Sequence, residues 1–128
     1  MPAMTTFLQN NLLNHVTQGI TYTPPVGLWL GLFTTATDSS GGGTEVSGGA
    51  YVRRSIVLSP PAGGTTRNST DVFFPTATAP WNSLTYLGIF DAVSSGNMLF
   101  YGKFNNPSFI NTGNTFAVEK DSILLLLK

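Results

Sequence analysis

The chain has 128 residues, of which only 9% are charged; six Lys/Arg balance six Asp/Glu, and there is no cysteine. This composition excludes nucleic acid as a partner, because nucleic-acid binding needs clustered cations, and it excludes disulfides and thiol chemistry. The hydrophobic share of 41% is enough to build a core. We therefore expect a folded domain whose weakly charged surface is partly covered by other subunits.

The N-terminal segment, residues 1–19, is predicted to hold the only helix, with Thr6 as N-cap, Gln9 completing a capping box and Gly19 as the stop. It carries more apolar surface than one short helix needs against one sheet, contributed by Phe7, Leu8, Leu12, Leu13 and Val16. It has no charged residue, so it must be held by packing. We expect this segment to make the main contact with another subunit. The alternative is that the helix only caps the open end of its own sandwich.

Residues 20–128 are predicted to be β-structure. Alternating apolar residues and Gly- or Pro-rich turns predict strands over 26–33, 51–58, 71–74, 84–90, 98–104, 115–119 and 122–127. The expected fold is mainly β: an antiparallel β-sandwich or jelly-roll-like domain with one short N-terminal helix, formed by the whole chain as a single domain, 1–128. The longest apolar run, 123–127, is far too short for a membrane helix, so no membrane partner is expected.

Two further features suggest contacts with a partner. The glycine-rich loop 37–49 has Glu45 and little else to fix it, so we expect it to be flexible and to become ordered beside the helix on contact. Arg53 and Arg54 are neighbours on a predicted strand and point to opposite faces. One of them faces a covered surface, where an arginine needs a carboxylate or carbonyl partner. We expect an ion pair between subunits there.

The residues with catalytic side chains form no recognisable site. His15 has no carboxylate or nucleophile near it in the sequence, and Asp91 begins a turn, where aspartate commonly bonds its own backbone. Glu119 and Asp121 flank Lys120, which favours a solvated hairpin end over a metal site. We expect no enzymatic activity, no cofactor and no metal.

Several motifs occur in a familiar order: "YTPP" at 22–25, "EVSGG" at 45–49, "FPTATA" at 74–79 and "GIFDA" at 88–92. In this order the chain resembles a family of small virion structural proteins of tailed bacteriophages, often labelled tail fibre proteins. It departs from the family pattern in a bulkier stretch at 84–87 and a leucine-rich final strand. The resemblance implies a non-enzymatic virion subunit, assembled in the cytoplasm of the host bacterium.

The position in the particle allows three interpretations. Since the chain has no heptads or repeats that could form a fibre shaft, we expect a capsid cement (decoration) protein that binds assembled major capsid protein and staples capsomers. The alternative is a tail- or baseplate-associated, fibre-like structural protein. A third is a glycan-binding receptor module that uses exposed aromatic residues such as Trp29, Trp81 or Tyr86. In each case we expect a homo-oligomer, with a trimer favoured over a dimer.

Overall fold

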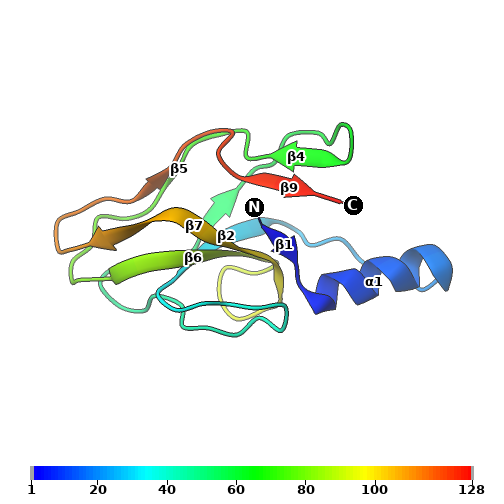
Figure 1. Cartoon of the computed structure of the whole chain (residues 1–128), viewed down its shortest axis with the longest axis horizontal. Helices are drawn as coiled ribbons and strands as arrows, with labels where there is room; N and C mark the ends of the chain where they lie inside the picture. Colours follow the sequence, from blue (N-terminus) through cyan, green and yellow to red (C-terminus); the bar gives the residue numbers. More distant parts are fainter. Residues whose placement is uncertain (1, 128) are drawn as a thin grey trace.

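The computed structural model describes residues 2–127, which form one helix and nine strands (Figure 1). In chain order these are β1 (Ala3–Met4), α1 (Thr6–Thr17), β2 (Leu28–Phe33), β3 (Arg54–Ile56), β4 (Thr65–Arg67), β5 (Val72–Phe73), β6 (Asn82–Phe90), β7 (Met98–Ile110), β8 (Ala117–Val118) and β9 (Leu124–Leu126). The fold is mainly β with antiparallel sheets and one short helix, consistent with the predicted β-sandwich-like domain.

The larger layer is a five-stranded antiparallel sheet in the order β1-β7-β6-β2-β3. Two small antiparallel pairs, β4-β9 and β5-β8, form the other layer. Asn68 is fully buried between them: its Nδ2 donates to the carbonyl of Glu119 at 2.8 Å, and its Oδ1 accepts from the N–H of Ile123 at 2.8 Å. These bonds connect the end of β8, in one small pair, to the start of β9, in the other.

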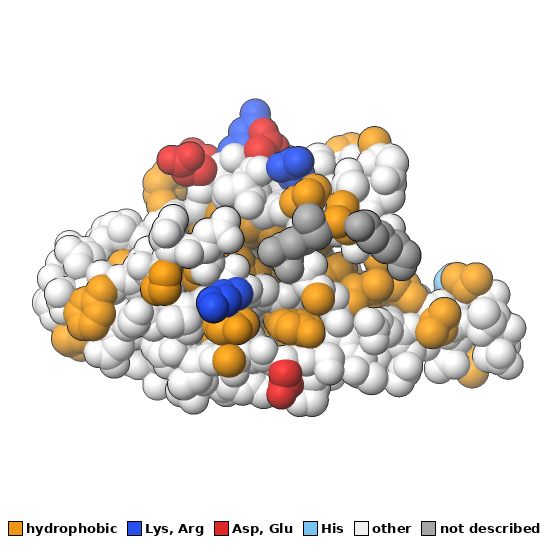
Figure 2. Space-filling view, in the orientation of Figure 1, with side chains coloured by type: hydrophobic (Ala, Val, Ile, Leu, Met, Phe, Trp, Pro, Cys, Tyr) orange, Lys and Arg blue, Asp and Glu red, His pale blue; other side chains and the backbone are white. Residues whose placement is uncertain are grey.

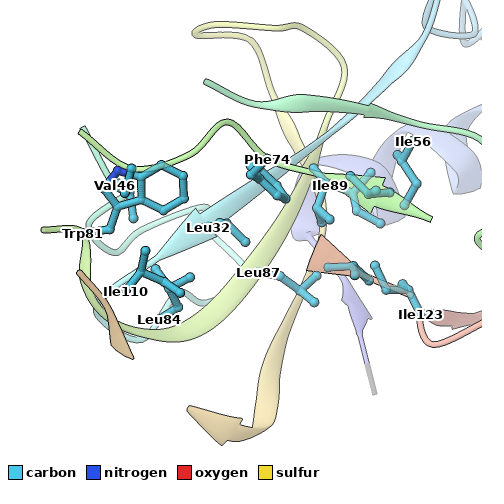
Figure 3. Packing of buried hydrophobic residues seen from close by; sticks show 14 of the residues in the cluster. Leu32, Val46, Ile56, Phe74, Trp81, Leu84, Leu87, Ile89, Ile110 and Ile123 are labelled. Carbon is cyan, nitrogen blue, oxygen red and sulfur yellow. The ribbon is translucent and has the colours of Figure 1, made fainter. Parts of the chain in front are cut away.

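The main core lies between the two layers (Figure 3). Leu30 and Leu32 of β2 and Ile89 of β6 are completely buried, and they face Phe74 and Ile123 from the covering layer. Every second residue of β2 points into this core, because side chains alternate across a strand. The predicted alternation of leucines in this strand is therefore confirmed.

The opposite face of the sheet holds a second, smaller cluster of Phe33, Phe90 and Met98. Gly31 of β2 lies directly opposite Gly88 of β6 in this face. A Cβ on Gly31 would lie 2.9 Å from a carboxylate oxygen of Glu45 and 3.0 Å from the Phe90 ring. Gly31 thus provides the room in which the Glu45 side chain lies against the sheet, and Gly88 provides room for the side chains of Met98 and Phe33.

The predicted strands are present at the predicted positions, but their lengths differ. Two strands were missed: β1, which precedes the helix, and β4, whose Thr-Thr-Arg sequence has no apolar alternation. Strand β7 runs to Ile110 rather than ending near 104, because it pairs with β6 again beyond a bulge at Leu84/Tyr86. The helix begins one residue earlier than predicted, with Thr5 rather than Thr6 as its N-cap.

Candidate assembly interface

Helix α1 is anchored at its first residue. The hydroxyl of Thr5, which is buried, donates to the carbonyl of Met98 at 2.7 Å and accepts the N–H of Leu8 at 3.4 Å. The backbone N–H of Thr5 donates to Leu99 at 2.9 Å. One residue therefore caps the helix and fixes its start to β7.

Beyond this anchor the helix leaves the β-structure and projects from one end of the molecule (Figure 1). Gly19, with φ of +67°, turns the chain at the helix end as predicted, and the chain returns along residues 20–27 to β2. On the way back, the N–H of Tyr22 donates to Nδ1 of His15 at 3.2 Å. We call residues 6–27 the arm.

The arm exposes aliphatic side chains that no part of the described chain covers. Leu13 is 61% exposed, Val16 79%, Ile20 57% and Val26 99%. Two of these, Ile20 and Val26, were not among the predicted interface residues. Both lie in the return segment, although Val26 was predicted to begin the strand 26–33, which in the structure begins only at Leu28. No signal in the sequence sets them apart, because the apolar alternation that begins at Val26 is that of a strand.

The predicted interface residues of α1 separate into two groups. Leu8 is buried at 6% exposure inside its own chain, and Leu12 is half-buried, so the first two turns do pack on the β-structure. Leu13 and Val16 are free, and Phe7 is exposed at 38%. The helix caps its own domain at its base and offers an apolar surface at its far end, which combines the two alternatives drawn from the sequence.

An apolar groove of about 290 Å³ lies at the base of the arm. Its walls include Leu12, Tyr22, Leu28, Leu58, Phe100 and Leu126. Burial of the ring raises the pKa of Tyr22, with a smaller contribution from the negative charge of Asp91. In Figure 2, hydrophobic side chains gather where the arm leaves the β-structure.

Charge is unevenly distributed over the molecule. The stretches 1–37, 55–66, 72–90, 92–102, 104–118 and 122–127 contain no Asp, Glu, Lys or Arg. Every residue that lines the apolar groove comes from these stretches. Charged side chains gather instead over the edge where the two small strand pairs meet (Figure 2), where Arg67 donates to the carbonyl of Asp121 and the N–H of Lys120 donates to Asp71.

The ion pair expected between subunits is formed within the chain. Arg53 makes two hydrogen bonds of 2.8 Å to the two carboxylate oxygens of Glu45 and also donates to the carbonyls of Ala92 and Ser95 at 2.9 and 2.8 Å. Its guanidinium lies 3.5 Å from the centre of the Phe90 ring. The expectation that one arginine faces a covered surface was right, but the cover is loop 91–97 and Glu45 of the same chain. Arg54 is exposed.

The glycine-rich loop is likewise held by its own contacts rather than waiting for a partner. The N–H of Val46 donates to Leu32, and that of Thr34 donates to Thr44. Asp38 accepts the hydroxyl of Ser40 and the N–H groups of Ser40 and Gly42, and these bonds lower the pKa of its carboxyl. The prediction of a flexible loop was wrong because the sequence did not show these side-chain bonds.

Tyr51 links this loop to the core. Its hydroxyl donates to Glu45 at 2.6 Å and accepts the N–H of Leu32 at 2.9 Å, while its ring packs on Phe74 and Trp81. Burial, reinforced by the hydrogen bond to Glu45, raises the pKa of the Tyr51 hydroxyl well above its usual range.

The remaining candidates have structural roles. Trp81 is buried at 2% exposure and its indole N–H donates to Gly49, whereas Trp29 and Tyr86 are half-buried in the sheet. Asp91 accepts the N–H of Asn97 at 2.7 Å, which is the turn role predicted for it. Within residues 2–127, no group of three or more His, Asp or Glu side chains is placed to hold a metal ion. In the same range, no helix has the length and hydropathy needed to cross a bilayer.

Comparison with known proteins gives one family. The model of the family described as Podophage GP4 fiber I protein gp80 matches residues 3–125, which is nearly the entire chain. The chain belongs to this gp80 family. No curated protein matches it.

Membership of the gp80 family confirms the resemblance noted from the sequence motifs. The family is one of phage virion structural (tail fibre) proteins and is not a known enzyme family. A member of the gp80 family is a component of the virion. The apolar arm and groove therefore belong to a protein of the virion.

Proposed function

We propose that this gp80-family protein is a tail- or fibre-associated structural subunit that assembles through its arm. The observation that carries the proposal is the arm itself: a helix and return segment, fixed at both ends to the sheet, with exposed aliphatic side chains and no charged residue. A fibre role fits the family description better than the capsid cement role expected from the sequence.

The energetics favour a covered arm. Fully burying a Val, Leu or Ile side chain stabilises by about 1.5–3 kcal/mol. Leu13, Val16, Ile20 and Val26 together thus offer a gain comparable to the association cost of about 4–15 kcal/mol. A surface of this kind is uncommon on a free monomer and common at subunit contacts.

The test locates the protein in the particle. A short peptide tag inserted into the exposed turn at 111–114, which lies at the far end of β7 from the arm, leaves the arm and groove unchanged. Labelled phage are then imaged by electron microscopy. We expect label at the tail only. Regular label over the head would overturn the proposal and support a decoration role.

The second measurement asks whether the arm is needed for incorporation. Val16→Asp places a charge on the apolar face of the arm, and Asn14→Asp places the same charge on the opposite face of the same turn. Both positions are exposed, so both variants should fold. We expect Val16→Asp to be lost from purified particles and Asn14→Asp to be retained. Equal retention of the two variants contradicts a role for the arm.

A further inference from the structure

The arm and the groove are two parts of one apolar surface on the same chain. Leu8 and Leu12 belong to α1 and also line the groove, so the surface runs without a break from the groove onto the helix. The far half of the arm has aliphatic side chains with nothing against them. The groove has apolar walls with nothing between them in the described chain.

We propose that the occupant of the groove is the arm of a second copy of this chain. This inference rests on the proposed function, since it names the neighbour to which the arm attaches. A twofold rotation places each arm over the groove of the other copy, and the two helices then lie side by side. Such a contact is closed and satisfies both copies equally, because each contributes the same surface.

The extent of the apolar surface and its lack of charge favour a second copy over a small ligand or a lipid surface. The groove volume of about 290 Å³ is at the lower end of the range of small-molecule pockets, but a small ligand held there would leave Val16 and Val26 exposed. A lipid surface attracts basic residues, and the arm and groove have none. A standard interface has about 20–30 residues on each partner. The arm, residues 6–27, and the groove walls together supply that many.

The absence of native cysteine allows a direct test by disulfide cross-linking in the full chain. Val16→Cys marks the far end of the arm and Thr65→Cys marks the wall of the groove. The two variants are purified separately, one carrying a mass tag, and mixed under mild oxidation. Because each chain has a single cysteine, a bond between positions 16 and 65 forms only between two copies. We expect this mixed dimer as the main product.

The control is Thr112→Cys, an exposed position in the turn at the far end of β7. Mixed with Val16→Cys, it should give no more than the background of random collisions. A chain that stays monomeric in sedimentation at 100-fold the protein concentration of the cross-linking, or that links 16 to 112 as readily as 16 to 65, overturns the proposal. Dimers joined only through position 16 also overturn it, since the arm then meets another arm away from the groove.

The result is separable from the proposed function. Tail labelling with a monomer in solution leaves the fibre role standing and removes the second copy as partner. Head labelling with efficient linking of 16 to 65 leaves the dimer contact standing and removes the fibre role.

Discussion

Single residues hold the loops of this protein on the sheet, and the strongest case is Arg53. Its guanidinium donates two hydrogen bonds to one carboxylate and one to each of two backbone carbonyls, and it lies over an aromatic ring. The neighbouring Arg54 is exposed. Sequence reasoning could identify that one arginine of the pair is covered, because strand side chains alternate. It could not identify Glu45 as the partner, since the pairing depends on how a loop folds back over Gly31.

The two adjacent arginines give a matched pair of variants. Arg53→Met leaves Glu45 three-quarters buried without its counter-charge, and we expect the free energy of unfolding to fall by about 2–4 kcal/mol, somewhat less than for a fully buried pair. Arg54→Met should change it by no more than about 0.5 kcal/mol. Urea denaturation of the two variants measures both values. An equal decrease in the free energy of unfolding for both variants would show that the ion pair does not stabilise the fold.

Tyr51 predicts how stability depends on alkaline pH. Its pKa is raised in the folded state, so its contribution is complete below the unfolded pKa of about 10 and is lost as the pH rises above that value. The unfolded chain then releases a proton that the folded chain retains. Above about pH 10, we expect this residue to lower the free energy of unfolding by about 1.4 kcal/mol per pH unit.

Tyr51→Phe should remove this extra slope while the other tyrosines remain in place. Denaturation curves at several pH values between 8 and 11 measure the slope for both proteins. The variant is expected to be less stable at neutral pH, because Glu45 and the N–H of Leu32 lose a hydrogen-bond partner. Identical slopes for the two proteins would contradict the assignment to this hydroxyl.

At the scale of elements, the sequence was most informative where side chains alternate over a buried strand. Strands β2 and β6 were predicted from apolar alternation, and the structure buries their leucines and isoleucine as expected, except for Leu28 at the start of β2, which is half-buried. Short strands such as β1 and β4 were missed, because two or three residues carry no readable period and form only where a partner strand is available. The helix of the arm was predicted, but the way in which the arm projects from the β-structure depends on where the sheet ends beneath it.

The N-cap of α1 provides the prediction at this scale. Thr5→Ala removes both the cap of the helix and a buried hydrogen bond to β7, and we expect it to destabilise the protein by about 1–2 kcal/mol. Thr17→Ala removes only two exposed bonds at the end of the helix, one to the carbonyl of Leu13 and one from the side chain of Gln18, and should cost no more than about 0.5 kcal/mol. Thermal denaturation compares the two variants. Similar melting temperatures would mean that Thr5 does not anchor the arm.

For the molecule as a whole, the uneven charge divides the surface into two regions with different uses. The charged edge over the small strand pairs is suited to remain in water, whereas the arm and groove are suited to be covered. Composition alone indicated that part of the surface is covered, but it could not say which part. The location of the apolar groove follows from the fold, which brings residues of four charge-free stretches of the sequence together.

The two attachments of the arm also determine how the molecule carries mechanical load. A pull on the arm reaches the sheet through β1, which pairs with β7 at two residues, and through β2, which pairs with β6 at five and with β3 at three. Under tension along the strands, the short β1 contact breaks first and lengthens the tether, while β2 resists in shear from the middle of the sheet. Because the two attachments join the same arm to the same sheet, they act in parallel, and we expect loss of the β1 pairing to transfer the load to β2 while the sheet stays folded.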